Sequence, residues 1–141
     1  MHLQSIKIST DIEDQIDEAK SKFIYKRLSK AFREQQVQAE IIKKHFETCT
    51  FPKVFCGDLN NSAFSYVYRT IKGDMTDAFE EAGSGFGKSY NFKYYPARID
   101  YILVENTIKV KQHTSLESFL QSDHFPQIAR LNLVNDNVTK K

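Results

Sequence analysis

"RIDYILV", residues 98–104, combines two charged side chains with an apolar run that is typical of a buried strand. Successive residues of a strand point to opposite faces of its sheet, so Arg98 and Asp100 share one face and Tyr101 lies on the other. The two charges admit two interpretations. Either Arg98 and Asp100 neutralise each other in a simple ion pair, or the aspartate is held at one end of the strand for chemistry.

The composition is that of an ordinary globular domain rather than a specialised class of protein. The 141 residues allow one domain with a real core, and 40% hydrophobic with 27% charged residues is usual for such domains. A net charge of +2 does not by itself indicate a nucleic-acid or membrane partner. No apolar stretch approaches the roughly 20 residues of a membrane-spanning helix, and the first residues lack a signal-peptide pattern. The cellular compartment is left open.

The two cysteines, Cys49 and Cys56, are too few for a disulfide framework and lack the spacing of a zinc site. Cys56 lies in a short apolar run, and unpaired cysteines are among the most frequently buried residues. We therefore expect Cys56 to be a small core residue with a reduced thiol, a state that is compatible with the cytoplasm.

The first third of the chain predicts helix. Asp11 fits an N-cap, and acidic residues follow it in the first turn. Neither glycine nor proline interrupts residues 1–51, so we expect residues 11–47 to form one long helix, or two with a break near Ser29. An apolar stripe at helical spacing would cover a sheet. Its positions are Ile12, Ile16, Ala19, Phe23, Phe32, Ala39, Ile42 and Phe46.

The middle of the chain predicts shorter elements. Residues 54–56 have the apolar content of a short strand, and a glycine and a polar loop follow them. Residues 63–82 are mainly helical in pattern. Thr76 or Asp77 can cap a short helix that stops at Gly83.

The last third predicts strands. Alternating apolar and polar residues indicate strands at 88–95, 98–106, 107–116 and 127–134, with the first two paired. Helices followed by antiparallel strands indicate an α/β fold of the layered α+β type. We expect one domain over residues 1–134 and a disordered tail at 135–141.

The glycine-rich stretch "GSGFGKS", residues 83–89, does not fit a phosphate-binding loop. That loop requires a glycine five residues before Gly87, where this chain has Ala82. It also runs from a strand into a helix, whereas here a helix is predicted before the stretch and a strand after it. We interpret the glycines as a turn that ends a helix and opens a hairpin.

"CGDLNN", residues 56–61, places Asp58 and Asn60 directly after a short strand. The carboxyl ends of strands in α/β proteins often carry ligand-binding groups. Asp58 could accept a proton from water or bind a hard cation, and Asn60 could donate a hydrogen bond to a phosphoryl oxygen. The alternative is an Asx turn, in which both residues serve only the backbone geometry.

"QSDHFP", residues 121–126, places Asp123 beside His124. Neighbouring residues of an extended chain point in opposite directions, so these two side chains need different partners. Asp100 can serve His124, because a carboxylate fixes the tautomer of an imidazole and favours its charged form. The alternative is a loop cap beside an exposed histidine.

The motifs become more informative together. In the order "HLQS … GDLNN … ARIDYILV … SDHFP", the chain resembles the endonuclease/exonuclease/phosphatase superfamily over residues 2–134. This superfamily includes deoxyribonuclease-I-like nucleases, abasic-site endonucleases, sphingomyelinases and inositol-phosphate phosphatases. The resemblance implies half of a four-layered α/β sandwich, a mostly antiparallel sheet with helices on one face. It also implies hydrolysis of a phosphodiester or phosphomonoester by an activated water, with Mg²⁺ or Mn²⁺, on nucleic acid, phospholipid or inositol phosphate.

Carried over residue by residue, the resemblance implies a role for each motif. Asp58 orients or deprotonates the attacking water, and Asn60 helps to hold the water and the phosphate. Asp100 supports His124, which contacts a phosphate oxygen and stabilises developing negative charge. Asp123, together with Asp58, belongs to the metal shell, and His2 contacts the phosphate from the other side. Arg98 is then expected to be structural.

The chain also departs from the family pattern. The family's first half, which supplies an Asn and a metal-binding Glu upstream of the "HL" step, has no counterpart here, because that step is at residue 2. We expect a C-terminal part with an incomplete site, poor metal affinity, and an exposed surface for self-association or for pairing with the missing half. The alternative function is a non-catalytic remnant that binds nucleic acid or a partner protein. Its candidate residues are Tyr90, Phe92, Lys93, Tyr94, Tyr95 and Arg98, which also fit an ordinary hairpin.

Overall fold

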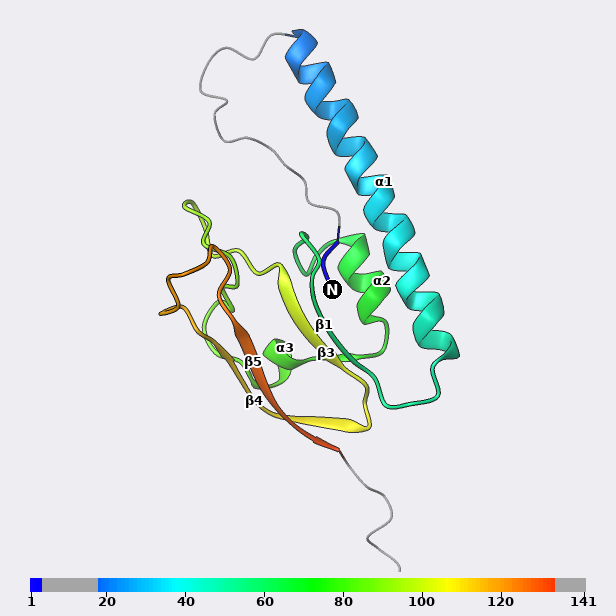
Figure 1. The fold of residues 1–141 in the computed structure, drawn as a ribbon, viewed down its shortest axis with the longest axis vertical. Coiled ribbons are helices and arrows are strands. Elements are labelled where there is room, and N and C mark those ends of the chain that lie inside the picture. Colours follow the sequence, from blue (N-terminus) through cyan, green and yellow to red (C-terminus); the bar gives the residue numbers. More distant parts are fainter. Residues whose placement is uncertain (4–17, 134–141) are drawn as a thin grey trace, which may run out of the picture.

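The computed structural model describes residues 1–3 and 18–133 of the chain (Figure 1). The predicted helix start at Asp11 and the predicted tail at 135–141 lie outside the described residues. None of the helices in the described part is long and apolar enough to cross a membrane. In chain order the elements are α1 (Glu18–Thr48), β1 (Val54–Asp58), α2 (Tyr66–Lys72), β2 (Thr76–Asp77), α3 (Ala78–Ala82), β3 (Asp100–Val104), β4 (Ile108–Ser115) and β5 (Gln127–Leu133).

The strands form two antiparallel sheets. The larger has the order β1-β3-β2, and the smaller is the pair β4-β5 with a register shift between Val110 and Gln112. In the β1–β3 ladder Val54 lies opposite Val104 and Asp58 lies opposite Asp100. The mixture of helices and antiparallel strands confirms the predicted α/β class. The register also brings both aspartates to the same end of the sheet.

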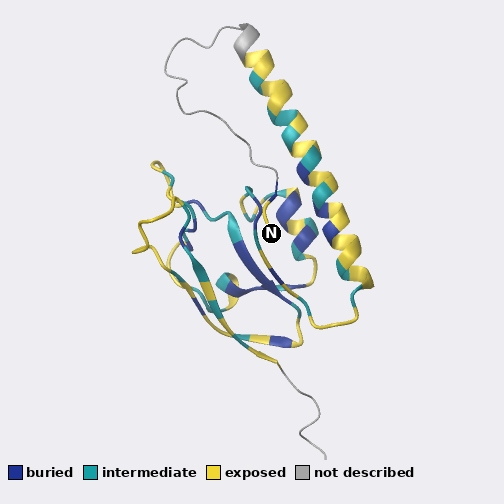
Figure 2. Cartoon of the chain, viewed as in Figure 1, coloured by how far each residue is buried: buried dark blue, intermediate teal, exposed yellow. Residues whose placement is uncertain are grey.

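Strand β3 is buried on both faces, and its residues lie on the sides to which the alternation in residues 98–104 assigned them. Tyr101 and Leu103 belong to a core cluster that also contains residues of α1 and α2. Ile102 and Val104 belong to a second cluster that includes Ala78 of α3 and residues of the β4–β5 pair. Figure 2 shows β3 dark blue between helices α1 and α2 and the β4–β5 pair. Helices α1 and α2 thus cover one face, and α3 lies in the second cluster.

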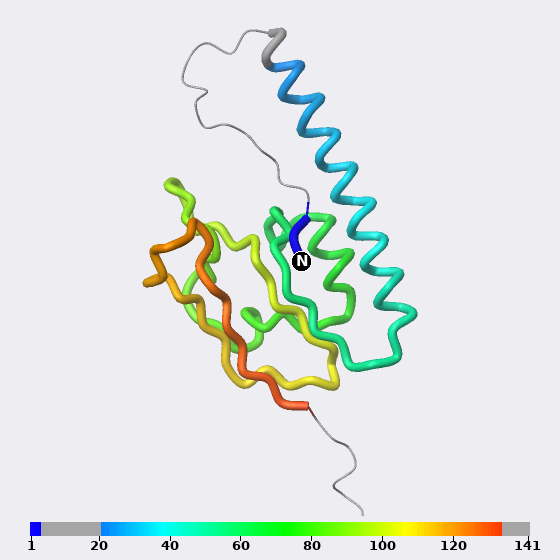
Figure 3. The backbone as a smooth tube through the Cα atoms, viewed as in Figure 1, coloured from blue at the N-terminus to red at the C-terminus, as the bar shows by residue number. Residues whose placement is uncertain are grey.

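Helix α1 runs unbroken through Ser29, so the single-helix alternative is correct. Its buried residues are Gln35, Ala39 and Ile42, which recur at helical spacing in its second half. Phe23 lies in the first half and is 64% exposed. That half extends beyond the rest of the described chain (Figure 3). The predicted apolar stripe therefore covers the sheet only with the C-terminal part of the helix.

The segment 63–82 is mainly helical, as predicted. Ser65 caps α2, and its side chain accepts a hydrogen bond from the backbone N–H of Tyr68. Asp77 rather than Thr76 caps α3, because its carboxylate accepts from the backbone N–H groups of Phe79 and Glu80. Helix α3 ends before Gly83, as the sequence indicated.

Two expectations about the strands are wrong. Residues 88–95 do not form a strand, and Tyr90 makes only isolated bridges, to Ala97 and to His124. Because the backbone of Tyr90 bridges to both Ala97 and His124, this segment does not pair along its length with one strand. Strand β3 pairs with β1 and β2 instead. Cys56 is exposed rather than buried. In β1 it points to the face opposite Phe55, and only the Phe55 face is covered by the core cluster.

Candidate active site

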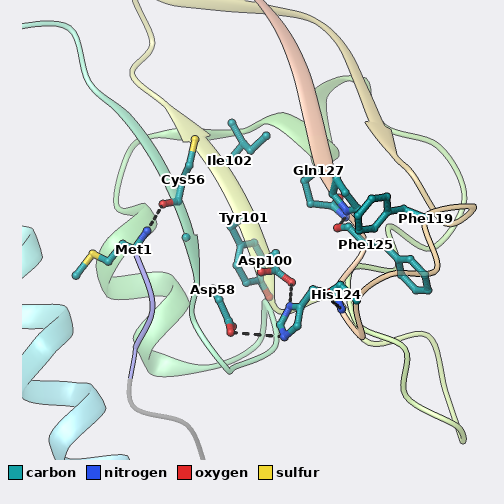
Figure 4. A pocket seen from close by; sticks show the side chains of 13 residues that line it. Met1, Cys56, Asp58, Asp100, Tyr101, Ile102, Phe119, His124, Phe125 and Gln127 are labelled. Carbon is teal, nitrogen blue, oxygen red and sulfur yellow. Dashed lines mark hydrogen bonds and ion pairs between the residues drawn. The ribbon is translucent and has the colours of Figure 1, made fainter.

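Three side chains from separate segments meet at one end of the larger sheet (Figure 4). The β1–β3 register places Asp58 opposite Asp100, and His124 comes from the segment that precedes β5. His124 Nδ1 lies 2.9 Å from Asp100 Oδ2, and His124 Nε2 lies 4.0 Å from Asp58 Oδ2. The predicted pairing of Asp100 with His124 is therefore present, with the other ring nitrogen directed toward Asp58.

Asp58 and Asn60 form a tight turn after β1. Asp58 Oδ1 accepts a hydrogen bond of 2.7 Å from the backbone N–H of Asn60, and Asn60 has a positive φ of 48°. This is the Asx turn that stood as the structural alternative. It is compatible with a site, because it leaves Asp58 Oδ2 beside His124. Asn60 Nδ2 lies 3.2 Å from that same oxygen and also donates to the carbonyl of Leu3.

His2 lies beside the same carboxylate. The backbone of residues 1–3 follows the outer edge of β1, where Leu3 N–H donates to Asp58 O and Asp58 N–H donates to Met1 O. His2 Nε2 is 3.3 Å from Asp58 Oδ2 and 3.3 Å from Asn60 Nδ2. Its side chain is 65% exposed, so one side of the imidazole is open to a ligand.

Asp123 is the predicted site residue that the structure does not bring into this group. It is exposed, its carboxylate lies 3.5 Å from the Ser122 hydroxyl, and its carbonyl accepts from the backbone N–H of Asn91. His124 points inward and its neighbour points outward, as expected for an extended chain. The metal-shell role of Asp123 stays a prediction.

The electrostatics distinguish Asp58 from an ordinary surface carboxylate. Burial raises the pKa of Asp58 above its usual range, while the N–H of Asn60 opposes the shift. The nearby charge of Asp100 adds to the rise, and His124 and His2 lower it. A carboxylate with a raised pKa is a better proton acceptor than a solvated one at neutral pH.

Arg98 does not pair with Asp100. Its guanidinium Nη1 lies 2.7 Å from Asp77 Oδ2, and the group stacks over the rings of Phe79 and Tyr101 at 4.8 and 4.7 Å. Asp77 is 1% exposed, so the ion pair belongs to the core. The interpretation of Arg98 and Asp100 as a mutual ion pair is wrong, and Asp100 is left to serve His124.

Ser89 is a supporting residue that the sequence reasoning missed. It is fully buried, and its hydroxyl accepts hydrogen bonds of 2.9 and 3.0 Å from the backbone N–H groups of Ile99 and Asp100. Its carbonyl accepts from the N–H of Phe125, next to His124. The adjacent Tyr90 places its ring 4.9 Å from the imidazole of His124. A single serine after a glycine-rich turn carries no sequence signal for this contact.

With this geometry in view, comparison with known proteins is informative. Residues 31–124 match the sequence model of the Endonuclease/Exonuclease/phosphatase family. The chain belongs to this family. Its members are hydrolases of the phosphatase and nuclease type. A search of curated proteins finds no match.

Several solved structures share the fold. An endonuclease/exonuclease/phosphatase from Bacteroides vulgatus is 28% identical, with a TM-score of 0.60 over 72% of this chain and 44% of that one. A functionally unknown conserved protein from Enterococcus faecalis V583 is 24% identical, with a TM-score of 0.60 over 71% and 44%. The mannosyl-6-phosphatase Bt3783 of Bacteroides thetaiotaomicron is 23% identical, with a TM-score of 0.54 over 70% and 44%. The chain thus spans 44% of the length of these solved relatives.

The site of this family member contains donors for a cation. Among the described residues, one ligand atom each from Asp58, Asp100 and His124 lie within 4.8 Å of one another. Carboxylate oxygens suit hard divalent cations such as Mg²⁺, which keeps several waters and needs only one or two protein carboxylates. The donor set therefore fits a Mg²⁺-type ion, although it does not select one metal.

A cavity of about 470 Å³ adjoins the site. Asp58, Asp100 and His124 line it together with Phe119 and Gln127 (Figure 4). A phosphate ester can thus approach the carboxylates and the imidazole from this side. The cavity is lined by both polar and apolar side chains.

Proposed function

We propose that this chain carries the catalytic centre of a metal-dependent phosphoesterase. The observation that supports it is the convergence of Asp58, Asp100 and His124, from three separate segments, within hydrogen-bonding or ion-pairing distance. Phosphate-ester hydrolysis needs an aligned water and compensation of negative charge rather than a covalent nucleophile. A buried carboxylate beside a supported imidazole provides these two elements.

The contacts support a role for each of these residues. Asp58, with its raised pKa, accepts the proton of the attacking water, and Asn60 Nδ2 beside it orients that water or a phosphate oxygen. Asp100 accepts the hydrogen bond of His124 Nδ1 and thereby fixes the orientation of the ring. His124 Nε2 then donates to a phosphate oxygen, and His2 is placed to contact the phosphate from the open side.

Mg²⁺ or Mn²⁺ is the proposed cofactor, held by Asp58 with help from Asp100. Such an ion, when bound, neutralises phosphate charge and makes water more acidic. With few carboxylates in the described group, we expect weak binding. Titration calorimetry with Mg²⁺ should give a dissociation constant in the millimolar range, and tight binding would contradict an incomplete ligand set.

We further propose that the chain acts together with a complementary polypeptide. Strand β1 is at the outside of its sheet, and its uncovered face presents Cys56 and Val54, which is 46% exposed. Residues 1–3 occupy the edge of β1 at Cys56 and Asp58, so the proposal rests on the exposed apolar side chains of this face. Exposed apolar surface favours pairing with another chain. Light scattering of the chain alone at rising concentration should reveal self-association. Val54→Lys should reduce it and Phe86→Lys, on an exposed loop, should not. A strict monomer would contradict self-association through this face.

The catalytic proposal is tested by hydrolysis of bis-p-nitrophenyl phosphate and of abasic DNA with Mg²⁺. Turnover should be metal-dependent and should fall about a hundredfold in Asp58→Ala and in His124→Ala, as for other lost electrostatic contacts. His45→Ala, at the far end of α1, is the matched histidine control. Turnover that survives both site variants would contradict the proposal.

A second function is favoured by one observation. The loop at 92–95 is not a strand, so hairpin alternation no longer accounts for its aromatic residues. Tyr94 and Tyr95 are 75% and 61% exposed, and Lys93 lies over the ring of Tyr94. Exposed aromatic and basic groups can stack nucleic-acid bases. Binding of a labelled single-stranded oligonucleotide that is salt-sensitive and lost in Tyr94→Ala, but retained in Phe86→Ala, would support a nucleic-acid-binding remnant.

A further inference from the structure

The hydroxyl of Tyr101 lies between the two loops that adjoin the site carboxylates, one after Asp58 and one before Asp100. It is 2.9 Å from the carbonyl of Asn61, in the loop that contains Asn60. It is also 2.9 Å from the carbonyl of Arg98, two residues before Asp100. A hydroxyl has one proton, so Tyr101 donates a hydrogen bond that is shared between both carbonyls.

Beyond the last residue pair of the β1–β3 ladder, few contacts hold these loops together. The ladder ends at Asp58 and Asp100, and after it the N–H of Leu59 still donates to the carbonyl of Ile99. Farther from the ladder, the hydrogen bonds of the Tyr101 hydroxyl connect the two loops. The side-chain amide of Asn61 also donates a hydrogen bond to the side chain of Gln35 in α1. This loop therefore contacts α1 as well as β3.

The surroundings keep the hydroxyl in place and protonated. Tyr101 is 2% exposed, and its ring stacks against the guanidinium of Arg98 and the ring of Tyr68. Burial raises the pKa of Tyr101 well above its ordinary value, although the charge of Arg98 opposes the shift. The group therefore remains a donor at any physiological pH, and the side chain has little freedom to turn away.

We propose that the Tyr101 hydroxyl is a positioning group that sets the separation between the Asp58–Asn60 turn and Asp100. It touches neither carboxylate and acts through the backbone of both loops. Without the shared hydrogen bond, two carbonyls lose their common donor and the loops separate or slide beyond the ladder. The catalytic consequence rests on the function proposed above, whereas the geometric claim stands without it.

The chain offers a matched control. Tyr68 is 3% exposed, belongs to the same core cluster, and also shares its hydroxyl between two acceptors, Asp77 and Glu80. Its acceptors lie away from the Asp58 turn. Tyr101→Phe and Tyr68→Phe thus each remove one buried hydroxyl with two acceptors, and only the first removes a tie between the site loops.

Amide hydrogen exchange by NMR measures the difference without any turnover. Relative to Tyr68→Phe, and after correction for global stability, Tyr101→Phe should accelerate exchange at Leu59 and Asn60 about tenfold. The β4–β5 amides should be equal in the two variants. Equal exchange at Leu59 and Asn60 would mean that the hydroxyl only stabilises the core, and would overturn the proposal.

Two further measurements complete the test. If Tyr101→Phe does not fold, the test uses the wild-type chain. Its Tyr101 hydroxyl proton should exchange slowly with solvent, and fast exchange would overturn the proposal. Where the chain turns over substrate, Tyr101→Phe should lower kcat about tenfold with KM unchanged, and Tyr68→Phe should not. Absence of turnover in the wild type would contradict the proposed function and leave the exchange result decisive for Tyr101.

Discussion

Asp58 lies directly opposite Asp100 in the last pair of the antiparallel β1–β3 ladder. Two carboxylates at one strand end repel each other, and this placement would be unfavourable without compensation. His124 provides this compensation, because its Nδ1 contacts Asp100 and its Nε2 is directed toward Asp58. The sheet register therefore creates the charge arrangement, and the segment before β5 completes it.

Replacing Asp100 should impair the site more than replacing Asp123. Asp100→Asn removes the charge that supports His124, so turnover of a phosphodiester should fall about a hundredfold. Asp123→Asn is the matched control, because this carboxylate is exposed and outside the group. Initial rates with Mg²⁺ measure the effect. An equal loss in both variants would return Asp123 to the metal shell that the family resemblance implies.

Removing the Ser89 hydroxyl should destabilise the fold. Ser89→Ala leaves the buried N–H groups of Ile99 and Asp100 without their acceptor. We expect a loss of about 1–3 kcal/mol in the free energy of unfolding, measured by urea denaturation. Ser115→Ala, which removes a partly buried hydroxyl bound to Gln127, should cost less. Equal costs would mean that water replaces the Ser89 contact.

Breaking the Arg98–Asp77 pair should be costly. The side chains are 12% and 1% exposed, so Arg98→Met leaves a buried carboxylate without its cation. The expected cost is about 3–5 kcal/mol in the free energy of unfolding. Lys53→Met breaks the more exposed pair with Glu105 and should cost much less. Arg98→Met combined with Asp77→Asn should recover part of the loss; no recovery would contradict an uncompensated charge as the cause.

The stability of the protein should fall in mild acid because of His113. Burial lowers the pKa of His113, with the charge of Asp77 opposing the shift and that of Arg98 adding to it. The folded state therefore favours the neutral ring. Its contribution is complete above the ordinary histidine pKa of about 6.5 and is lost as pH falls through the lowered value.

Urea denaturation of the wild type and of His113→Leu between pH 7.5 and 5 measures this contribution. The wild type should lose more unfolding free energy over this range than the variant, because leucine does not titrate. His45→Leu, at an exposed position of α1, is the control and should follow the wild type. Parallel curves for wild type and His113→Leu would assign the acid sensitivity to other groups.

The sequence predicted the elements whose pattern is local. The two-residue period of 98–104 correctly placed Tyr101 and Ile102 on opposite, buried faces, and the absence of glycine and proline correctly indicated a long first helix. Motif order predicted that Asp100 would support His124, and the contact is present. The catalytic roles of these residues remain predictions.

Local sequence patterns could not predict the contacts between segments that lie far apart in the sequence. Cys56 sits in an apolar run, yet its face of β1 is uncovered, and an apolar run does not reveal what lies across a sheet face. Residues 88–95 have the composition of a strand, but within them Tyr90 forms only isolated bridges, one to Ala97 and one to His124. In both cases the deciding neighbour is far away in sequence.

By itself, the amino-acid sequence determined which residues alternate, which helix is continuous, and which polar side chains stand at strand ends, because these follow from backbone periodicity. Only the tertiary structure decided that Arg98 neutralises Asp77, that Ser89 and Tyr101 hold the loops of the site, and that Asp123 points away from it. The physical reason is that strand register and loop packing bring together groups whose separation along the chain carries no periodic signal.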